Sequence, residues 1–478
     1  MIYIYRNFLR IILLIGLLVY SIISYYQTSY SFVSVYSLWE SIILIMLSLL
    51  IYCSRKEYNK FLRRQVFTIA TIFLLSFVIV HFFNYLSYCL GILDHGFLSM
   101  RYVNKASKVS TCAFIAILIG LLIPRHPFKG QKTTLSIEIG ETLNYFLCIS
   151  LIMFVAFTDK RYFSAGGNNL VLNEIGWNPI GAVGNTSCIA CIIASVISKI
   201  INYRNVHLSL IRYLKIYSFS FYLLTFIYLI LVLISGDRGP LIDIFFSFFL
   251  GYILINKAKI KVWVALICII IGANILTYLS FLRGNSEDLS LDKISQVNER
   301  MGSFREDNNL FFGPVSDLSN VVDAYHLVFE HTEINEPING IGIGFQLIAV
   351  LPGIRSVIYN ISGIDIEFLS TDALATRLLG EDYGAGTTCV ADSYYNLGLI
   401  GTIMLFIVFG MIVRKLDLSL YQDNTQLLVF VIAICYFVKS IYLGRSTIFQ
   451  PINLIFYTCL YLFLSKWVRM LFIDRRDL

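Results

Sequence analysis

The feature that most constrains the fold is a series of apolar runs, each about 20 residues long, which recur along the chain between polar connections. A helix of about 20 apolar residues spans the hydrocarbon core of a bilayer. Hydrophobic residues make up 57% of the 478 residues, charged residues only 14%, and the mean hydropathy is +0.74. These values exclude an ordinary soluble domain, so the sequence predicts an all-α polytopic membrane protein.

We count about twelve apolar runs of membrane-spanning length. The first follows Arg6 and Arg10 and has no small-residue cleavage site, so we expect a retained helix and not a removed signal peptide. The runs divide the chain into residues 1–283, a polar segment 284–393, and residues 394–478. They lie at residues 8–25, 31–53, 67–92, 109–123, 142–158, 182–201, 216–235, 239–256, 262–281, 394–413, 426–443 and 450–470.

Basic residues indicate which ends of the runs face the cytoplasm. The connections after runs 2, 4, 6, 8 and 10 and the tail after run 12 all carry Lys or Arg. Because short basic loops stay in the cytoplasm, we expect both termini inside and residues 284–393 outside. The connection 93–108 does not fit, since it should lie outside yet carries Arg101, Lys105 and Lys108. The short basic clusters between apolar runs also argue against a nucleic-acid partner for this chain of net charge +7.

The polar segment 284–393 is acidic. It holds 17 of the 30 Asp and Glu but five of the 37 Lys and Arg, a net charge of −12 against +19 for the rest. The apolar spacing in SDLSNVVDAYHLVFEH predicts one helix, and DALATRLLGEDYG predicts a second short helix that ends near Gly380. Gly340, Gly342 and Gly344 predict a break between them. We expect a large, mostly helical domain on the outer surface.

Three arginines fall at the outside ends of runs, each beside Gly or Ser: Arg238, Arg283 and Arg445. Arginine is uncommon at this face, and the planar guanidinium suits phosphate oxygens. The sequence therefore predicts one shared anion site, and the alternative is that the three side chains extend to lipid headgroups.

Three further ionisable residues lie within the outer halves of runs: Glu40, Asp243 and Lys439. A charge in a membrane helix is costly unless it faces water or a partner. They could line a wet site with the arginines, or neutralise one another, for example Asp243 with Arg238 or Lys439. His81 is interpreted as a hydrogen-bonded helix contact, and the pair Cys188 and Cys191 as small packing residues and not metal ligands.

Several short motifs now support a family resemblance. They are SGDRG after a run, FLRGN opening the polar segment, PINGIGIG within it, ADSYYNLGLIG closing it, and LGRS near the end of run 11. With the pattern of runs, they resemble the Wzy-type polymerases of O-antigen and capsular polysaccharide, a family of oligosaccharide repeat unit polymerases related to the O-antigen ligases. The resemblance implies a GT-C-like fold of about twelve helices with a large periplasmic loop.

The resemblance implies a substrate and a site. The substrate is an oligosaccharide on undecaprenyl pyrophosphate, whose pyrophosphate would be bound by Arg238, Arg283 and Arg445, with Lys439 and Asp243 at the same level. Guanidinium groups can stabilise the departing pyrophosphate in place of a divalent cation, so no metal or other cofactor is expected.

The acceptor hydroxyl needs a general base. Related ligases carry a His shortly before the run that follows the loop, whereas GAGTTCVADSYYN has none, which argues against ligase activity. Asp392 is the first candidate, although it could simply cap the next helix. The other candidates are Glu381, Asp382 and the more distant His326 and His331. Tyr394, Tyr395 and Trp177 could stack on sugar rings or act as ordinary interfacial aromatics.

The expected function is polymerisation of lipid-linked repeat units at the periplasmic face of a bacterial inner membrane, with a chain-length regulator as a candidate partner. A lipid-linked oligosaccharide flippase is the rival from another class. Transporters usually show repeated halves and charged groups near the midplane, and neither pattern is visible in this sequence. The O-antigen ligase is the third alternative.

Overall fold

The computed structural model describes residues 2–30, 32–54, 67–92, 97, 99–123, 139–163, 178–204, 206–258, 321–350, 369–380, 386–422 and 425–472. All regular structure in these ranges is helical, without a strand. Among the described residues, nine helices are long and apolar enough to cross a membrane. The prediction of an all-α, multi-pass membrane protein is therefore confirmed. The expected run at 262–281 lies outside the described residues.

The chain forms two compact units, each built from separate stretches of sequence. Unit 1 contains Met1–Pro127, Val315–Leu418 and Ser440–Gln450; unit 2 contains Phe128–Pro314, Ser419–Lys439 and Pro451–Leu478. The division at residues 283 and 393 that the sequence suggested stays a prediction about membrane sidedness.

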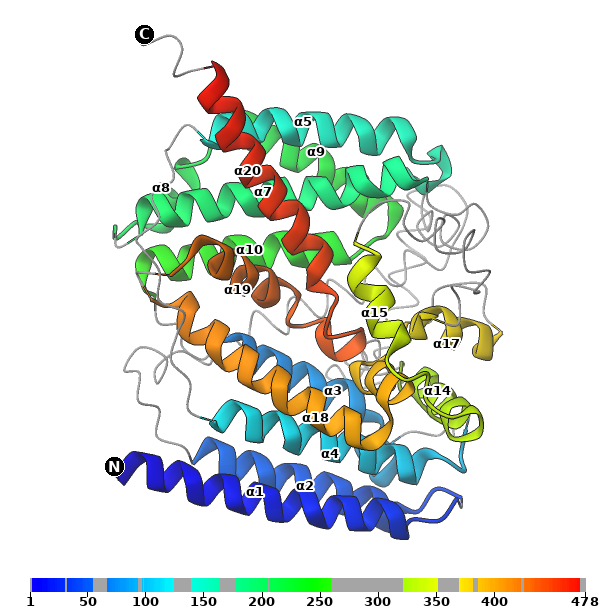
Figure 1. Cartoon of the computed structure of the whole chain (residues 1–478). Coiled ribbons are helices and arrows are strands. Elements are labelled where there is room, and N and C mark those ends of the chain that lie inside the picture. The colour runs from blue at the N-terminus through cyan, green and yellow to red at the C-terminus, as the bar shows by residue number, and fades with distance from the viewer. Residues whose placement is uncertain are drawn as a thin grey trace. The chain divides into compact units, whose positions relative to one another are not determined.

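Unit 1 is built around α4, almost every residue of which is buried. It packs on α1 and α2, and α3 packs on α2 and α4 (Figure 1). Side-chain caps begin two of these helices, because Ser34 accepts from the N–H of Ser37 and Thr68 from that of Thr71. The bounds are α1 Ile2–Gln27, α2 Val35–Cys53, α3 Ile69–Cys89 and α4 Val103–Leu122.

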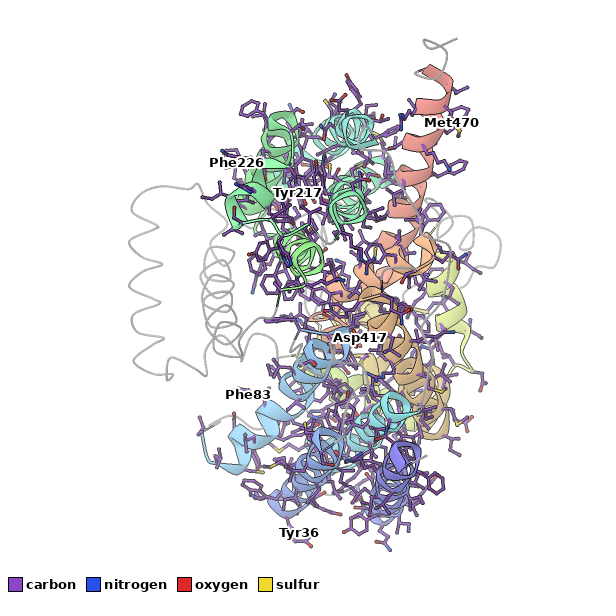
Figure 2. The ribbon with its side chains drawn as sticks, turned by 90° about the vertical axis from the view of Figure 1, so that its left-hand side faces the viewer. Tyr36, Phe83, Tyr217, Phe226, Asp417 and Met470 are labelled. Atoms are coloured by element: carbon purple, nitrogen blue, oxygen red, sulfur yellow. The ribbon has the colours of Figure 1, made fainter. Side chains whose placement is uncertain are left out.

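Helix α18 (Cys389–Leu420) packs against α3 and α4 in the same unit (Figure 1). Its Gly410 meets Gly120 of α4, where a Cβ on Gly410 would lie 2.5 Å from Ile117 O. Near its C-terminal end Asp417 accepts hydrogen bonds from the backbone N–H of Ile69 at 2.8 Å and Ala70 at 3.2 Å (Figure 2). The Asp417 carboxylate therefore pairs with two backbone N–H groups that have no partner within α3. Its negative charge also interacts favourably with the positive N-terminal end of the helix dipole.

The described part of segment 284–393 contributes three helices to unit 1: α14 Val321–Asn335, α15 Ile341–Ile348 and α17 Thr371–Leu379. Helix α14 packs on α17, α3 and α4. The two predicted helices are confirmed as α14 and α17, and α17 ends at Gly380 with a positive φ of 67°. The predicted break at the glycines is wrong in part, because Gly342 and Gly344 lie within α15 and only Gly340, at φ 79°, precedes it.

Unit 2 is a second helical group in which α7 packs on α5, α10 and α20. Gly184 of α7 allows the close approach to α5, since a Cβ there would lie 2.6 Å from Phe154 N. Helix α9 packs on α5 and α10, and α19 on α10 and α20. The bounds are α5 Ile139–Phe157, η2 Lys160–Phe163, α7 Pro179–Tyr203, α8 Leu210–Lys215, α9 Phe219–Ser235, α10 Gly239–Asn256, α19 Leu427–Lys439 and α20 Pro451–Phe472.

Several predicted boundaries are wrong, among them those of runs 4, 10 and 11. Run 4 was expected at 109–123, but α4 begins at Val103 and so includes Lys105 and Lys108. Run 10 was expected at 394–413, but α18 begins at Cys389, so the last residues of the predicted loop are helical. Run 11 was expected at 426–443, but α19 stops at Lys439 and is followed by the 3-10 helix η5 Leu443–Arg445. The polar start of α4 is compatible with a helix because its two lysines have carboxylate partners, described below.

Candidate functional site

Asp392 lies in the first turn of α18 with its side chain almost fully buried. Its Oδ1 accepts hydrogen bonds from Gln346 Nε2 at 2.8 Å and Thr371 Oγ1 at 3.0 Å. Gln346 belongs to α15 and Thr371 begins α17, so three helices meet at this carboxylate. Thr447 Oγ1 donates to Gln346 Oε1 at 2.8 Å. We call Asp392, Gln346, Thr371 and Thr447 the Asp392 cluster.

Asp392 does not cap α18. The capping hydrogen bond is made by Thr388, whose Oγ1 accepts from the N–H of Ala391 at 3.0 Å. The backbone N–H of Asp392 already donates to Thr388 O at 2.9 Å, as expected inside a helix. The capping interpretation of Asp392 is therefore wrong, and its carboxylate is used instead to bind side chains from other elements.

Asn396, one turn after Asp392, holds α15 against α18. Its Oδ1 accepts from Ile343 N at 3.0 Å, its Nδ2 donates to Asp392 O at 2.8 Å, and its carbonyl accepts from Gly340 N at 2.7 Å. A Cβ on Gly342 would lie 2.7 Å from Asn396 Oδ1 and 2.8 Å from Leu369 O. Glycine is needed here for close approach, which is why the glycine motif is compatible with a helix.

Arg445 lies in the same part of unit 1. It ends η5, two residues before Thr447, and is half-buried. A Cβ on Gly386, just before α18, would lie 4.0 Å from Arg445 Nε. The segment is fixed to α3, because Ser76 Oγ donates to Ile441 O at 2.5 Å and Gly444 packs on Ser76. The structure thus brings Arg445 and the Asp392 cluster into one neighbourhood.

A second carboxylate cluster, which the sequence analysis missed, surrounds Glu333 of α14. Its carboxylate accepts hydrogen bonds from the hydroxyls of Tyr25, Tyr30 and Tyr394, and Lys105 Nζ lies 3.3 Å from Oε2. Burial raises the pKa of Glu333, but the hydrogen bonds from Tyr30 and Tyr394 and the charge of Lys105 outweigh it and hold the pKa below its ordinary value. Glu333 is therefore an ionised group at neutral pH. We call these five residues the Glu333 cluster.

The Glu333 cluster adjoins the Asp392 cluster along α18. Tyr394 is two residues after Asp392, and its hydroxyl lies 2.8 Å from that of Tyr25 as well as bonding Glu333. The next residue, Tyr395, accepts a backbone hydrogen bond from Ile338 and its ring lies 6.2 Å from that of His331. Tyr394 is almost fully buried, and its ring packs face to face with that of Phe329, with 4.7 Å between the ring centres. One weak indication of the Glu333 cluster was present in the sequence, namely Lys105, a cation in a connection that was expected to carry few.

His326 lies deep in unit 1 and is fully buried. Its Nε2 is 2.7 Å from Tyr85 Oη and its Nδ1 is 3.9 Å from Asp323 Oδ1. Burial lowers the pKa of His326 below its ordinary value, although Asp323 opposes this effect. His81 behaves as expected for a helix contact, since its Nδ1 is 3.0 Å from Phe77 O. The polar partners of His326 are thus Tyr85 and Asp323, and neither belongs to the Asp392 cluster.

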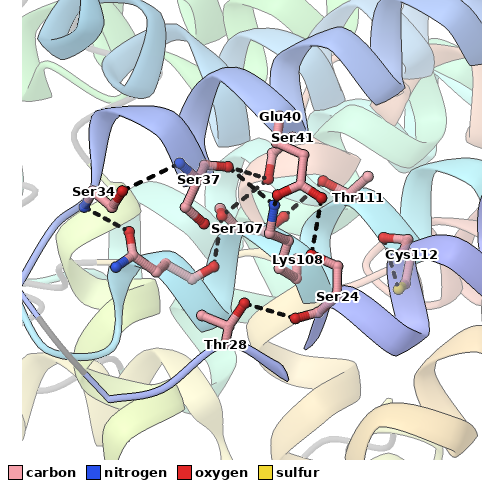
Figure 3. Close-up of polar contacts among 12 residues, drawn as sticks. Ser24, Thr28, Ser34, Ser37, Glu40, Ser41, Ser107, Lys108, Thr111 and Cys112 are labelled. Carbon is pink, nitrogen blue, oxygen red and sulfur yellow. Dashed lines mark hydrogen bonds and ion pairs between the residues drawn. The ribbon is translucent and has the colours of Figure 1, made fainter. Parts of the chain in front are cut away.

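The ionisable residues inside the membrane helices form pairs. In unit 2, Lys439 Nζ lies 2.5 Å from Asp243 Oδ2, with Asp243 fully buried. In unit 1, Lys108 Nζ lies 2.7 Å from Glu40 Oε2 and also donates to Ser37 O at 3.0 Å (Figure 3). In the Glu40–Lys108 pair, Ser24 Oγ also donates to Glu40 Oε1 at 3.0 Å (Figure 3). The neutralisation alternative is confirmed for Asp243, with Lys439 as its partner.

The structure does not test whether the remaining candidates converge. Arg238 precedes α10 in unit 2, whereas Arg445 belongs to unit 1. Arg283, Glu381, Asp382 and Trp177 lie outside the described residues. The shared arginine site therefore stays a prediction. Among the described residues, no group of three or more His, Cys, Asp or Glu could hold a metal ion.

Comparison of the chain with protein-family models, with curated proteins and with solved structures finds no match.

Proposed function

We propose that the chain is a membrane glycosyltransferase that joins oligosaccharide repeat units carried on undecaprenyl pyrophosphate, at the outer face of a bacterial inner membrane. The observation that carries the proposal is the Asp392 cluster, a buried carboxylate of α18 with uncharged donors from two other helices and with Arg445 nearby. The motif resemblance supports the substrate class.

The proposed reaction needs one base and a stabilised leaving group. The hydroxyl oxygen of the acceptor sugar bonds to the anomeric carbon of the donor, and the bond from that carbon to the pyrophosphate oxygen breaks. The pyrophosphate keeps the electron pair, and the hydroxyl proton passes to a carboxylate. Arg445, with Arg238 and Arg283, would stabilise the charge that develops on the pyrophosphate; removing one such donor typically lowers kcat about 100-fold or more.

Asp392 fits the role of base better than His326. Gln346 and Thr371 both bond Oδ1 of Asp392, so the carboxylate is held in one orientation by neutral donors. Within the described part of the chain no cation forms an ion pair with Asp392, so its basicity is not lost to a salt bridge. His326 instead shares its Nε2 with the buried Tyr85. Glu381 and Asp382 stay alternatives.

The decisive experiment replaces Asp392 with Asn. The Asn side chain keeps an oxygen that can accept from Gln346 and Thr371, so the three-helix junction should survive while basicity is lost. We expect at least about a 100-fold loss of polymer formation, with normal protein level and retained binding of the lipid-linked donor. Polymerisation at the wild-type rate in Asp392→Asn would move the base to Glu381, Asp382 or His326.

Transport of the lipid-linked oligosaccharide is the second candidate. The buried pairs Asp243–Lys439 and Glu40–Lys108 favour it, because ion pairs within apolar helices also occur in transporters. Purified protein in vesicles with lipid-linked repeat units on one side distinguishes the two. A transferase lengthens the saccharide, whereas a transporter moves the lipid between leaflets and leaves its saccharide unchanged.

A further inference from the structure

Tyr30 is an exposed aromatic residue with an anchored hydroxyl. It lies in the connection between α1 and α2, and 51% of the residue is exposed. Its hydroxyl donates to the Glu333 carboxylate, and Lys105 Nζ donates to Tyr30 Oη at 2.7 Å. Lys105 Nζ also lies 4.1 Å from the ring centre, and the ring of Tyr102 lies 5.2 Å away. The ring is therefore held in one place while half of its residue surface stays free.

This arrangement differs from that of an ordinary interfacial tyrosine, which directs its hydroxyl to water or headgroups. Tyr36, six residues later at the start of α2, is such a case: it is 80% exposed, and its side chain lies at the edge of the molecule (Figure 2). Tyr30 instead directs its hydroxyl to a carboxylate whose side chain is only 13% exposed. The Glu333 cluster thus fixes Tyr30 before any ligand arrives, which lowers the entropy lost on binding.

The charges of the cluster indicate what could bind. Glu333 is ionised and Lys105 lies 3.3 Å from it, so the two charges cancel. A net charge on the ligand would gain little here, and the four acceptor positions of the Glu333 carboxylate are taken by Tyr25, Tyr394, Tyr30 and Lys105. Lys105 uses two of its three N–H donors on Tyr30 and Glu333, so the third can donate to a hydroxyl of a neutral ligand. The exposed ring offers an apolar surface beside these groups. A sugar ring combines the two properties, because it has an apolar C–H face and hydroxyls at its edge.

We infer that Tyr30, Glu333 and Lys105 form a subsite that binds one neutral sugar ring of the acceptor or of the growing polymer. The inference rests on the proposed function for the identity of the saccharide. Tyr394 bonds Glu333 and lies two residues after Asp392 on α18, so the two side chains leave the same helix on different faces. A sugar held on Tyr30 would keep the polymer attached between additions.

The test measures saccharide binding directly. The probe is the oligosaccharide mixture released by mild acid from the surface polysaccharide of the producing cells, added to the purified full-length protein and followed by saturation-transfer NMR. Tyr30→Ala should weaken binding at least about tenfold, as loss of one stacking ring does in other stacked ligands. Tyr30→Phe keeps the ring but loses both hydroxyl contacts, so an intermediate loss is expected. Tyr36→Ala, an exposed tyrosine of the same segment, should bind as the wild type does.

Polymer length gives a second readout in cells. Tyr30→Ala should shift the polymer to shorter chains, because each weakened encounter ends elongation earlier, while Tyr36→Ala keeps the wild-type length. Equal binding by the wild type and Tyr30→Ala, or no binding by the wild type, overturns the subsite even if polymer forms. Binding that depends on Tyr30 in a protein that forms no polymer overturns the proposed function and leaves the subsite standing. If Tyr30→Ala fails to fold, Tyr30→Phe and Lys105→Met decide by the same measurements.

Discussion

Lys105 and Lys108 occupy a part of the chain where orientation rules expect few cations, and both have a carboxylate opposite. Lys105 pairs with Glu333 and Lys108 with Glu40. The positive-inside rule counts Lys and Arg and not net charge, so the two pairs explain how the fold accommodates these lysines and do not decide which side of the membrane they face. The sequence alone could not reveal these pairs. Glu40 lies 68 positions from Lys108 and Glu333 lies 228 positions from Lys105, and sequence periodicity carries no information about pairs at such separations.

Removing one partner of the Glu40–Lys108 pair should lower the free energy of unfolding strongly. Lys108 is fully buried and Glu40 is mostly buried, so Lys108→Met leaves a carboxylate without its cation. We expect a loss of about 3 kcal/mol in the free energy of unfolding in detergent, and recovery of most of it in Glu40→Gln/Lys108→Met. Arg101→Met, at an exposed position four residues before Lys105, should change stability by less than about 0.5 kcal/mol. Equal losses in Lys108→Met and Arg101→Met would contradict the assigned pair.

At the scale of elements, the existence of the described membrane helices followed from the apolar runs, but their ends did not. Helix α4 extends to Val103 and α18 to Cys389, because their polar first turns are satisfied by side chains from other helices. Hydropathy alone assigns such turns to loops. The motif Gly340–Gly344 was expected to break the chain, whereas Gly342 permits contact between α15 and α18. Both cases arise from tertiary contacts that a local pattern does not contain.

The contact between α4 and α18 should be sensitive to a single methyl group. A Cβ on Gly410 would lie 2.5 Å from Ile117 O and 3.1 Å from Gly120 Cα, so Gly410→Ala forces the two backbones apart. We expect a loss of about 2 kcal/mol in the free energy of unfolding, measured by thermal unfolding in detergent. Gly16→Ala in α1 is the matched control, because nothing lies within 4 Å of its Cβ. It should be neutral or stabilising by up to about 1 kcal/mol. Similar behaviour of the two variants would show that the helices do not meet at Gly410.

At the scale of the whole molecule, the candidate site was predictable in part. Asp392, Arg445 and Tyr394 were chosen from motifs at the ends of runs, and the structure places all three in unit 1. Glu333 was missed because nothing in its local sequence distinguishes it from the other acidic residues of segment 284–393. Its importance depends on Tyr25, Tyr30 and Lys105, which come from the first 105 residues of the chain. Convergence of this kind is a property of the fold.

The orientation of the chain in the membrane decides whether these clusters can act on an exported substrate. Five basic connections and the basic tail predict that the termini lie inside and that α14 lies outside. Ile334 of α14 and Ile211 of α8 are 65% and 68% exposed, and the same basic connections predict opposite sides for them.

Single cysteines at these two positions, in a chain whose ten natural cysteines are replaced, give the test. An impermeant maleimide should label Ile334→Cys in intact spheroplasts and Ile211→Cys only after lysis. Because α14 carries Glu333 and packs with α17 of the Asp392 cluster, label at position 334 reports the side on which both clusters lie. Labelling in the reverse order would place both clusters at the cytoplasmic face. Polymerisation of exported units by these residues would then be excluded.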